Sequence, residues 1–234
     1  MTTMWSDAWP RFSTAEYLAV GVLVAMLMAF SEIHPRMRAR WDQPIWLDDA
    51  IRARVRAATS GQRRRSGRVS DFLLWTSTIA PFACCLVLHR YGNADVATQM
   101  ALISTFALLA ASAANRIATT LAGRPRPYTR VLDGEGQIKR HPSGHPERLR
   151  SFFSGHTALT ATGASLVATF AIHLQWVRGA GGWAAAMTAV LTFCAVGALR
   201  VRADRHYFSD VAAAAVVGVM FGAVYPIWAH FSAA

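Results

Sequence analysis

The chain alternates between long apolar runs and shorter polar stretches. Six apolar runs can be traced, at residues 17–30, 72–88, 96–114, 158–176, 183–199 and 211–231. Several are slightly shorter than the ~20 residues needed to cross a bilayer, so their flanking residues must contribute. One such run would also suit a buried core helix, but six in 234 residues are typical of a polytopic membrane protein. The pattern predicts an all-α fold, a bundle of six transmembrane helices forming one membrane-embedded domain over residues 1–234.

The composition supports this interpretation and narrows the choice of partners. Hydrophobic residues make up 53% of the chain and charged residues 16%. In a soluble protein, the net charge of +11 would suggest nucleic acid as a partner. Here the basic residues are nearly all arginine and lie between apolar runs. We therefore expect the membrane and a lipid phosphate substrate as partners, and no nucleic acid.

The polar stretch at residues 33–70 carries ten arginines. Part of it alternates apolar and basic side chains as an amphipathic helix on a membrane surface does, with Trp41, Ile45, Trp46, Ile51 and Val55 among Arg52, Arg54 and Arg56. We expect these arginines to face lipid phosphates, the alternative being a solvated loop. The triplet Arg63-Arg64-Arg65 is interpreted as a solvated or lipid-contacting turn and not as part of a site.

The polar stretch at residues 122–150 opens with the sequence GRPRPY at 123–128. Its two prolines hold the backbone extended, which would present Arg124 and Arg126 in fixed directions. A planar guanidinium offers paired donors to phosphate oxygens. This favours a phosphate site over the alternative, a basic loop resting at the membrane interface.

The tripeptide Ser154-Gly155-His156 directly precedes the fourth apolar run. A helix start presents unpaired backbone N–H groups and a partial positive charge to an anion. Gly155 allows the backbone to approach closely, Ser154 adds a hydroxyl donor, and His156 can transfer a proton near neutral pH. We therefore predict that a phosphate group binds here.

An earlier copy of the same tripeptide, Ser143-Gly144-His145, lies in the preceding polar stretch. It is followed by proline and polar sequence instead of an apolar run, so we assign the function to the later copy. His141 and His145 have the spacing of metal ligands on a helix, but a proline and a glycine lie between them. We expect neither a metal nor another cofactor.

The last polar cluster lies between the fifth and sixth runs and contains Arg200, His206 and Asp210. His206 and Asp210 are one helical turn apart, so the carboxylate can hold one imidazole nitrogen and leave the other free. A nucleophilic or basic histidine is oriented in this way. The alternative is a salt bridge at a helix end.

The order of the runs places these clusters on one side. In a chain with six crossings, the first, third and fifth connections lie on the same side of the membrane. The GRPRPY segment and Ser154-Gly155-His156 belong to the third connection, and His206 belongs to the fifth. We therefore predict one composite site.

These clusters, in this order, resemble the motifs of the type 2 phosphatidic acid phosphatase superfamily, which includes membrane lipid phosphatases, bacterial acid phosphatases and vanadium haloperoxidases. The family pattern is Lys, six residues and Arg-Pro, then Ser-Gly-His, then Arg, five residues, His, three residues and Asp. The second and third motifs are complete here, and the first ends in Arg126-Pro127. The resemblance covers about residues 70–230 and favours the lipid phosphatase branch, because the haloperoxidases are soluble.

One position departs from the family pattern. Counting back from Arg126-Pro127, the family lysine falls at Thr119, which can donate one hydrogen bond but carries no charge. We predict that Arg124 supplies the missing charge. The candidate phosphate ligands are then Arg126, Ser154, Gly155, Arg200, Arg124 and Thr119.

The resemblance implies a metal-independent hydrolase of phosphoric monoesters or diphosphates. His206, oriented by Asp210, would attack phosphorus and form a phosphohistidine. His156 would protonate the leaving oxygen, and water would then release phosphate. A phosphotransferase with the same intermediate, or a non-catalytic membrane protein that retains the fold, remains an alternative.

The resemblance and the charge pattern disagree about orientation. The first, third and fifth connections hold 10, 7 and 3 basic residues, against single ones on the other side, so the positive-inside rule places the site in the cytoplasm. Typical bacterial members of the family place it on the outer face of the inner membrane. Arginines recruited for phosphate bias the count, although the ten in the first connection have no such role in the sequence. We expect the outer face.

Overall fold

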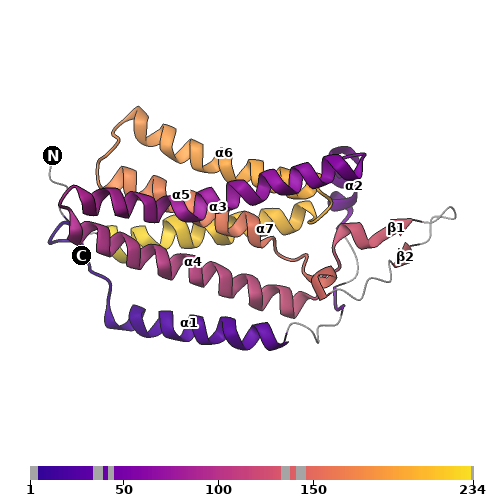
Figure 1. Cartoon of the computed structure of the whole chain (residues 1–234), viewed down its shortest axis with the longest axis horizontal. Helices are drawn as coiled ribbons and strands as arrows, with labels where there is room; N and C mark the ends of the chain where they lie inside the picture. Colours follow the sequence, from indigo (N-terminus) through magenta and orange to yellow (C-terminus); the bar gives the residue numbers. More distant parts are fainter. Residues whose placement is uncertain (1–4, 34–38, 42–44, 133–137, 141–145, 233–234) are drawn as a thin grey trace.

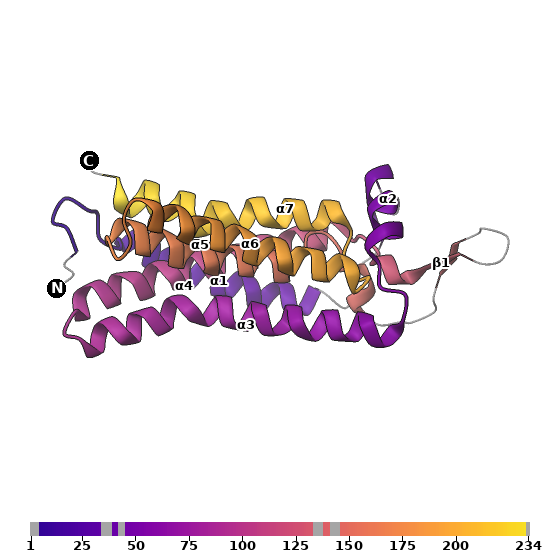
Figure 2. The ribbon, with the colours of Figure 1, turned by 90° about the horizontal axis from the view of Figure 1, so that it is seen from above.

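The computed structural model describes residues 5–33, 39–41, 45–132, 138–140 and 146–232. Within this part of the chain, six helices run side by side and alternate in direction (Figure 1 and Figure 2). They are α1 (Thr14–Ile33), α3 (Ser60–Arg90), α4 (Ala94–Ala122), α5 (Gly155–His173), α6 (Ala180–Arg202) and α7 (Phe208–Val219). Helix α7 continues as two π-helical segments, η4 (Met220–Val224) and η5 (Ile227–Phe231).

The alternation brings the α1–α3, α4–α5 and α6–α7 connections to one end of the bundle (Figure 1). The short elements gather there too: α2 (Trp46–Val55), η2 (Pro127–Thr129), η3 (Pro146–Leu149), and the antiparallel strands β1 (Arg130–Leu132) and β2 (Ile138–Arg140). The hydrophobic pattern does not predict this hairpin. The prediction that the polar clusters share one end is confirmed.

The prediction of a membrane protein is confirmed, but the predicted number of membrane spans is not. Four helical stretches in the described chain are long and apolar enough to cross a bilayer, at Ser60–Arg90, Ala94–Thr129, Ala180–Arg202 and Phe208–Phe231. The apolar part of α1, Thr14–Phe30, is shorter, and α5 is not among the four. The protein is therefore an all-α membrane protein, but the predicted six spans are not confirmed.

Helix α5 lacks the composition of a lipid-facing helix because it lies inside the bundle. It packs against α3, α4, α6 and α7. Four of its threonines, Thr157, Thr160, Thr162 and Thr169, are buried. A helix enclosed by other helices meets protein instead of lipid, so small and hydroxylated side chains can replace large apolar ones.

Two glycines of the last helix allow it to approach α5 closely. A Cβ atom at Gly218 would lie 2.4 Å from the Ala158 carbonyl oxygen, and one at Gly222 would lie 2.3 Å from that of Thr162. Glycines four residues apart form a groove that admits a neighbouring helix backbone. Because α5 carries Gly155 and His156 at its start, this contact fixes one wall of the site.

Replacing Gly218 with leucine is therefore expected to destabilise the bundle. The added side chain must displace the α5 backbone, and overpacking of this kind costs at least ~1–3 kcal/mol. The measurement is the thermal unfolding midpoint in detergent by circular dichroism. Gly21→Leu on α1 is the matched control, because a Cβ there meets nothing within 4 Å. Equal midpoints for the two variants would contradict the close packing of α7 on α5.

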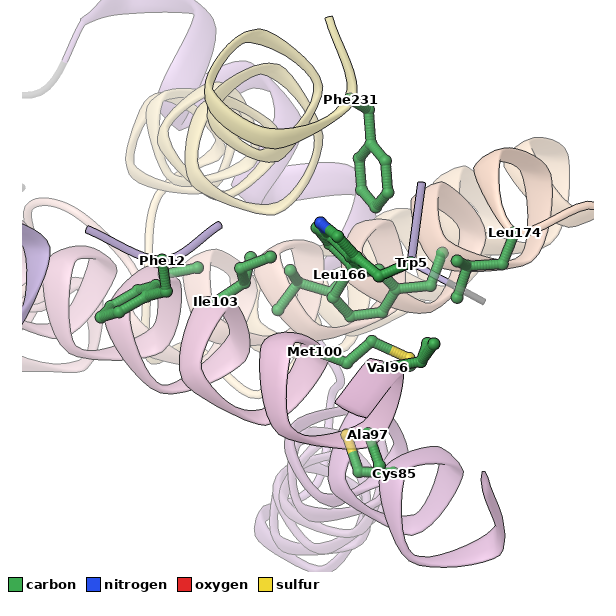
Figure 3. Close-up of a cluster of buried hydrophobic side chains, with 12 residues drawn as sticks. Trp5, Phe12, Cys85, Val96, Ala97, Met100, Ile103, Leu166, Leu174 and Phe231 are labelled. Carbon is green, nitrogen blue, oxygen red and sulfur yellow. The ribbon is translucent and has the colours of Figure 1, made fainter. Parts of the chain in front are cut away.

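The end of the bundle opposite the site is closed by a hydrophobic cluster (Figure 3). Trp5 and Phe12, from the segment before α1, are buried with Met100 and Ile103 of α4 and with Leu166 of α5. Packing at this end fixes α4 and α5 against each other. The candidate site lies at the opposite end of the bundle.

Helix α2 lies across the bundle at the site end (Figure 2). The predicted helix is present, and Trp46 is exposed on it. The expectation that its arginines face lipid is wrong for two of them. Arg52 and Arg56 both donate to the buried carboxylate of Asp204, with Nε–O distances of 2.7 Å. These ion pairs dock α2 on the α6–α7 connection.

Candidate active site

A cavity of about 900 Å³ opens at the end of the bundle where the polar connections meet. It is lined by α3, α4, the start of α5, the end of α6 and the α4–α5 and α6–α7 connections. Of the candidate residues, those that line it are Thr119, Arg126, Gly155, His156, Arg200 and His206. Arg124, Ser154 and Asp210 do not line it.

His206 lies between α6 and α7 with its ring almost fully buried. Its Nδ1 lies 2.8 Å from the backbone carbonyl oxygen of Ser151. A carbonyl can only accept a hydrogen bond, so Nδ1 carries the proton and Nε2 keeps its lone pair. This is the tautomer that a nitrogen nucleophile requires.

The carboxylate of Asp210 does not hold the ring directly, contrary to the prediction. Its Oδ2 is 3.9 Å from Nδ1 of His206. Asp210 instead accepts from Ser151 Oγ at 2.5 Å, from the Tyr207 backbone N–H at 2.8 Å, and from Arg124 Nη1 at 2.5 Å. Asp210 therefore fixes the residue whose carbonyl orients His206. The motif spacing gave no sign of Ser151.

Arg126 and Arg200 bring two buried guanidinium groups to the cavity, 7% and 5% exposed. The Nε of each is buried and has no hydrogen-bond partner among the described residues. Their ion pairs are long, at 3.4 Å from Arg126 to Glu147 and 3.4 Å from Arg200 to Asp71. Buried cations with spare donors are suited to an incoming anion.

These two cations also influence His206. Burial, reinforced by the charges of Arg126 and Arg200, lowers the pKa of His206 well below its usual value. The imidazole is therefore neutral at neutral pH, and the lone pair on Nε2 is available there.

His156 lies in the first turn of α5 and meets a carboxylate that the motifs do not include. Its Nε2 is 2.8 Å from Oδ1 of Asp71 on α3. The same oxygen is 3.4 Å from Nη1 of Arg200, which also donates to Ser70 Oγ at 3.3 Å. Asp71 is the one acidic residue of α3, in a helix whose first turns are rich in arginine. A single carboxylate in a helix that begins with several arginines is the sequence feature from which a role for Asp71 could have been predicted.

The family model of the PAP2 superfamily matches residues 100–233, more than half of the chain. The chain belongs to the PAP2 superfamily. Membership implies phosphatase chemistry on a phosphoester. No significant match was found among curated proteins or among solved structures. The matched region begins within α4, so α3 and Asp71 contribute to this PAP2 site from outside it.

Ser154 has a structural role in this PAP2 protein and does not face the cavity. Its hydroxyl accepts from the Thr157 backbone N–H at 3.4 Å and caps the start of α5. Gly155 lines the cavity, and a Cβ there would lie 3.1 Å from Oδ1 of Asn115. Asn115 in turn donates to the Phe153 carbonyl at 2.6 Å. A larger residue here would press on Asn115, which fills the adjoining space.

Arg124 does not supply the missing charge, so that prediction is wrong. Helix α4 ends at Gly123 in a left-handed conformation, and the chain turns Arg124 inward. Its guanidinium donates to Asp210 at 2.5 Å and to Asp48 of α2 at 2.7 Å, between the rings of Trp41 and Tyr207. Arg124 is a buried cation that joins two carboxylates.

Thr119 lines the cavity but offers little to a ligand. Its hydroxyl donates to the carbonyls of Asn115 and Arg116, at 2.8 and 3.0 Å. The position expected to carry a lysine is therefore neutral and already bonded. The earlier tripeptide, Ser143-Gly144-His145, and His141 lie outside the described residues, so the choice between the two copies stays a prediction.

Proposed function

We propose that this protein is a membrane lipid-phosphate phosphohydrolase that acts through a phosphohistidine at His206. The observation that carries the proposal is the pair of buried guanidinium groups, Arg126 and Arg200, each with an unpartnered Nε. They line the same cavity as His206, whose Nε2 bears the lone pair. A tetrahedral anion bound by the two arginines would complete their hydrogen bonds.

In the first step, Nε2 of His206 attacks phosphorus and the bond to the ester oxygen breaks. The electron pair leaves with that oxygen, and His156 gives it a proton. Negative charge on the equatorial oxygens is stabilised by Arg126, Arg200 and the free N–H groups at the start of α5. In the second step, water attacks phosphorus, His156 takes its proton, and the P–N bond breaks to release phosphate.

Asp71 positions His156 in this scheme. Its carboxylate contacts both the proposed general acid and Arg200, so it holds two groups that act on the phosphate. Burial and the charge of Arg200 lower the pKa of His156, and the carboxylate of Asp71 opposes that shift and so supports the protonated form that a general acid needs. Both effects end if the carboxylate is made neutral.

Replacing Asp71 with asparagine is therefore expected to lower kcat/KM by about tenfold and to move its alkaline limb to lower pH. The pH profile separates this role from a structural one, because a folding defect would lower the rate without moving the limb. Asp71→Glu should recover part of the activity and of the profile. An unshifted profile in Asp71→Asn would exclude a role through His156.

We further propose that α1 and α5 also cross the membrane and that the cavity lies at the outer face of the inner membrane. A 19-residue helix such as α5 spans about 28 Å. Four of the ten arginines of the first connection have a place within the fold, so that count argues less strongly for the cytoplasm. Arg52 and Arg56 bind Asp204, and Arg64 and Arg68 line the cavity. Labelling of single cysteines at the chain ends in intact cells tests the orientation.

The direct test of the proposed function is phosphate release by the protein purified in detergent. The substrates are phosphatidic acid, phosphatidylglycerol phosphate and a prenyl diphosphate, assayed with and without an added alcohol. We expect release to survive excess chelator, since arginines neutralise the phosphate, and to be inhibited by vanadate. No release from any of these lipids would refute the proposal, and transfer to the alcohol in place of release would make the enzyme a phosphotransferase.

A further inference from the structure

The first turns of α3 form a wall of the cavity. The helix begins at Ser60, where the hydroxyl of Thr59 accepts from the Gln62 backbone N–H. Arg64, Arg68 and Asp71 then recur at intervals of four and three residues, which places them on one helix face, and all three line the cavity. The triplet at 63–65 is thus helical, and the expectation that it forms a turn outside any site is wrong.

This face runs outward from the reacting groups. Asp71 marks its inner end, because its carboxylate contacts His156. With a rise of 1.5 Å per residue, Arg68 starts about 4.5 Å farther along the helix axis and Arg64 about 10 Å farther. The two arginines therefore follow one another from the phosphate site towards the cavity mouth.

Arg64 and Arg68 differ from most neighbouring arginines in having no partner. Both side chains are exposed, and no hydrogen bond or ion pair joins either to another described residue. By contrast, Arg63 donates to the Ala57 and Ala58 carbonyls, and Arg52 and Arg56 share Asp204. Arg63 also lines the cavity but is already bonded, so Arg64 and Arg68 are the arginines of this helix start that are free to bind a ligand there.

Seven arginines and three carboxylates line the cavity, so its lining carries a net charge of +4 with the histidines neutral, more than one phosphate monoester neutralises. Arg126 and Arg200 already stand beside the two histidines. Arg64 and Arg68 add two cations to the same space, where like charges repel unless an anion lies between them. A substrate with a single phosphate group, bound between Arg126 and Arg200, would leave Arg64 and Arg68 without an anionic ligand.

We propose that Arg64 and Arg68 bind a second phosphate group of the substrate, and that the preferred substrate is a lipid diphosphate. This inference rests on the proposed function. The terminal phosphate lies between Arg126 and Arg200, and the phosphate next to the lipid lies along α3. When Nε2 of His206 bonds to the terminal phosphorus, the bridging P–O bond breaks. The electron pair and negative charge pass to the departing lipid monophosphate, where the α3 arginines stabilise them.

The test compares farnesyl diphosphate with farnesyl monophosphate in neutral detergent. We expect the wild-type kcat/KM for the diphosphate to be at least ~10-fold higher, and the double variant Arg64→Gln/Arg68→Gln to lose ~10–100-fold on the diphosphate alone. Its activity on the monophosphate should stay within about threefold of wild type. Arg65→Gln is the matched control, since Arg65 is exposed on the same helix but does not line the cavity.

A second arm separates the substrate's phosphate from the headgroups of surrounding lipids. The same assays are run in vesicles of phosphatidylcholine with and without phosphatidylglycerol. If the two arginines bind bulk anionic lipid, the double variant will lose activity on both substrates, and only when phosphatidylglycerol is present. That result would overturn the proposal.

The two proposals fail in different ways. Release from both substrates with equal efficiency, or an equal loss on both in the double variant, refutes the second phosphate site and leaves the phosphohydrolase in place. No release from either substrate by the wild-type protein refutes the phosphohydrolase itself.

Discussion

Replacing His206 with alanine is expected to lower kcat by at least ~10⁴-fold, the scale seen when a catalytic nucleophile is removed. The ring is almost fully buried, has Nδ1 bound to the Ser151 carbonyl, and lines a cavity that also holds two buried arginines. His156, the other histidine that lines the cavity, has its Nε2 bound to Asp71 and is assigned the role of general acid. Phosphate release from the best lipid substrate is the measurement.

The control for this variant must show that the bundle is intact. His89→Ala alters an exposed histidine near the C-terminal end of α3, away from the cavity, and should retain full activity. Both variants should unfold at the wild-type temperature within a few degrees. The phosphohistidine scheme is refuted if the folded His206→Ala protein keeps even a tenth of the wild-type rate.

Replacing Arg124 with alanine is expected to destabilise the protein by ~3–5 kcal/mol, as when one partner of a buried ion pair is removed. The substitution leaves the carboxylates of Asp48 and Asp210 buried without their cation, and it removes the group packed between Trp41 and Tyr207. Thermal unfolding in detergent measures the loss. Activity should fall at least with the folded fraction, and KM should stay near the wild-type value, because Arg124 does not line the cavity.

Arg54→Ala provides the comparison, because Arg54 is exposed on α2 and has no ion pair with a described residue. It should unfold at the wild-type temperature. If Arg124→Ala were as stable as Arg54→Ala and only raised KM, the residue would bind phosphate after all. The first interpretation of Arg124 would then be restored.

The location of the site could be predicted from the sequence because it follows from the number and order of the helices along the chain. Alternating helices with short connections must bring alternate connections to the same end. The GRPRPY segment, the start of α5 and the residues around His206 therefore meet, wherever each helix sits in detail. The family motifs then identify Arg126, Arg200 and the two histidines, which all line the cavity.

The roles of neighbouring residues could not be predicted, because they depend on partners remote in the chain. Arg124 and Arg126 are two residues apart with similar surroundings in the sequence. Arg124 turns inward because it forms ion pairs with Asp48 and Asp210, whereas Arg126 lines the cavity. The sequence pattern could not show that an aspartate of α2 would reach the α4–α5 connection.

The contribution of α3 was missed for a related reason. A run of arginines next to an apolar segment is usually a solvated or lipid-facing stretch, and that interpretation was applied to residues 63–65. The role of α3 in the site becomes visible only in the folded protein, where α3 packs beside α5 and α6 and Asp71 contacts His156 and Arg200. Helix packing of this kind is not encoded in a local pattern.

The position of the cavity at the end of a membrane bundle determines how the proposed lipid substrate would reach it. Withdrawing an acyl or prenyl chain from the bilayer costs about 0.8 kcal/mol for each CH₂ group, which for a long chain exceeds the binding energy of one phosphate. At this end of the helices only the headgroup has to enter, and the tail stays in the hydrocarbon. The concentration that governs the rate is then the lipid's mole fraction in the membrane plane, and diffusion to the site takes place in two dimensions.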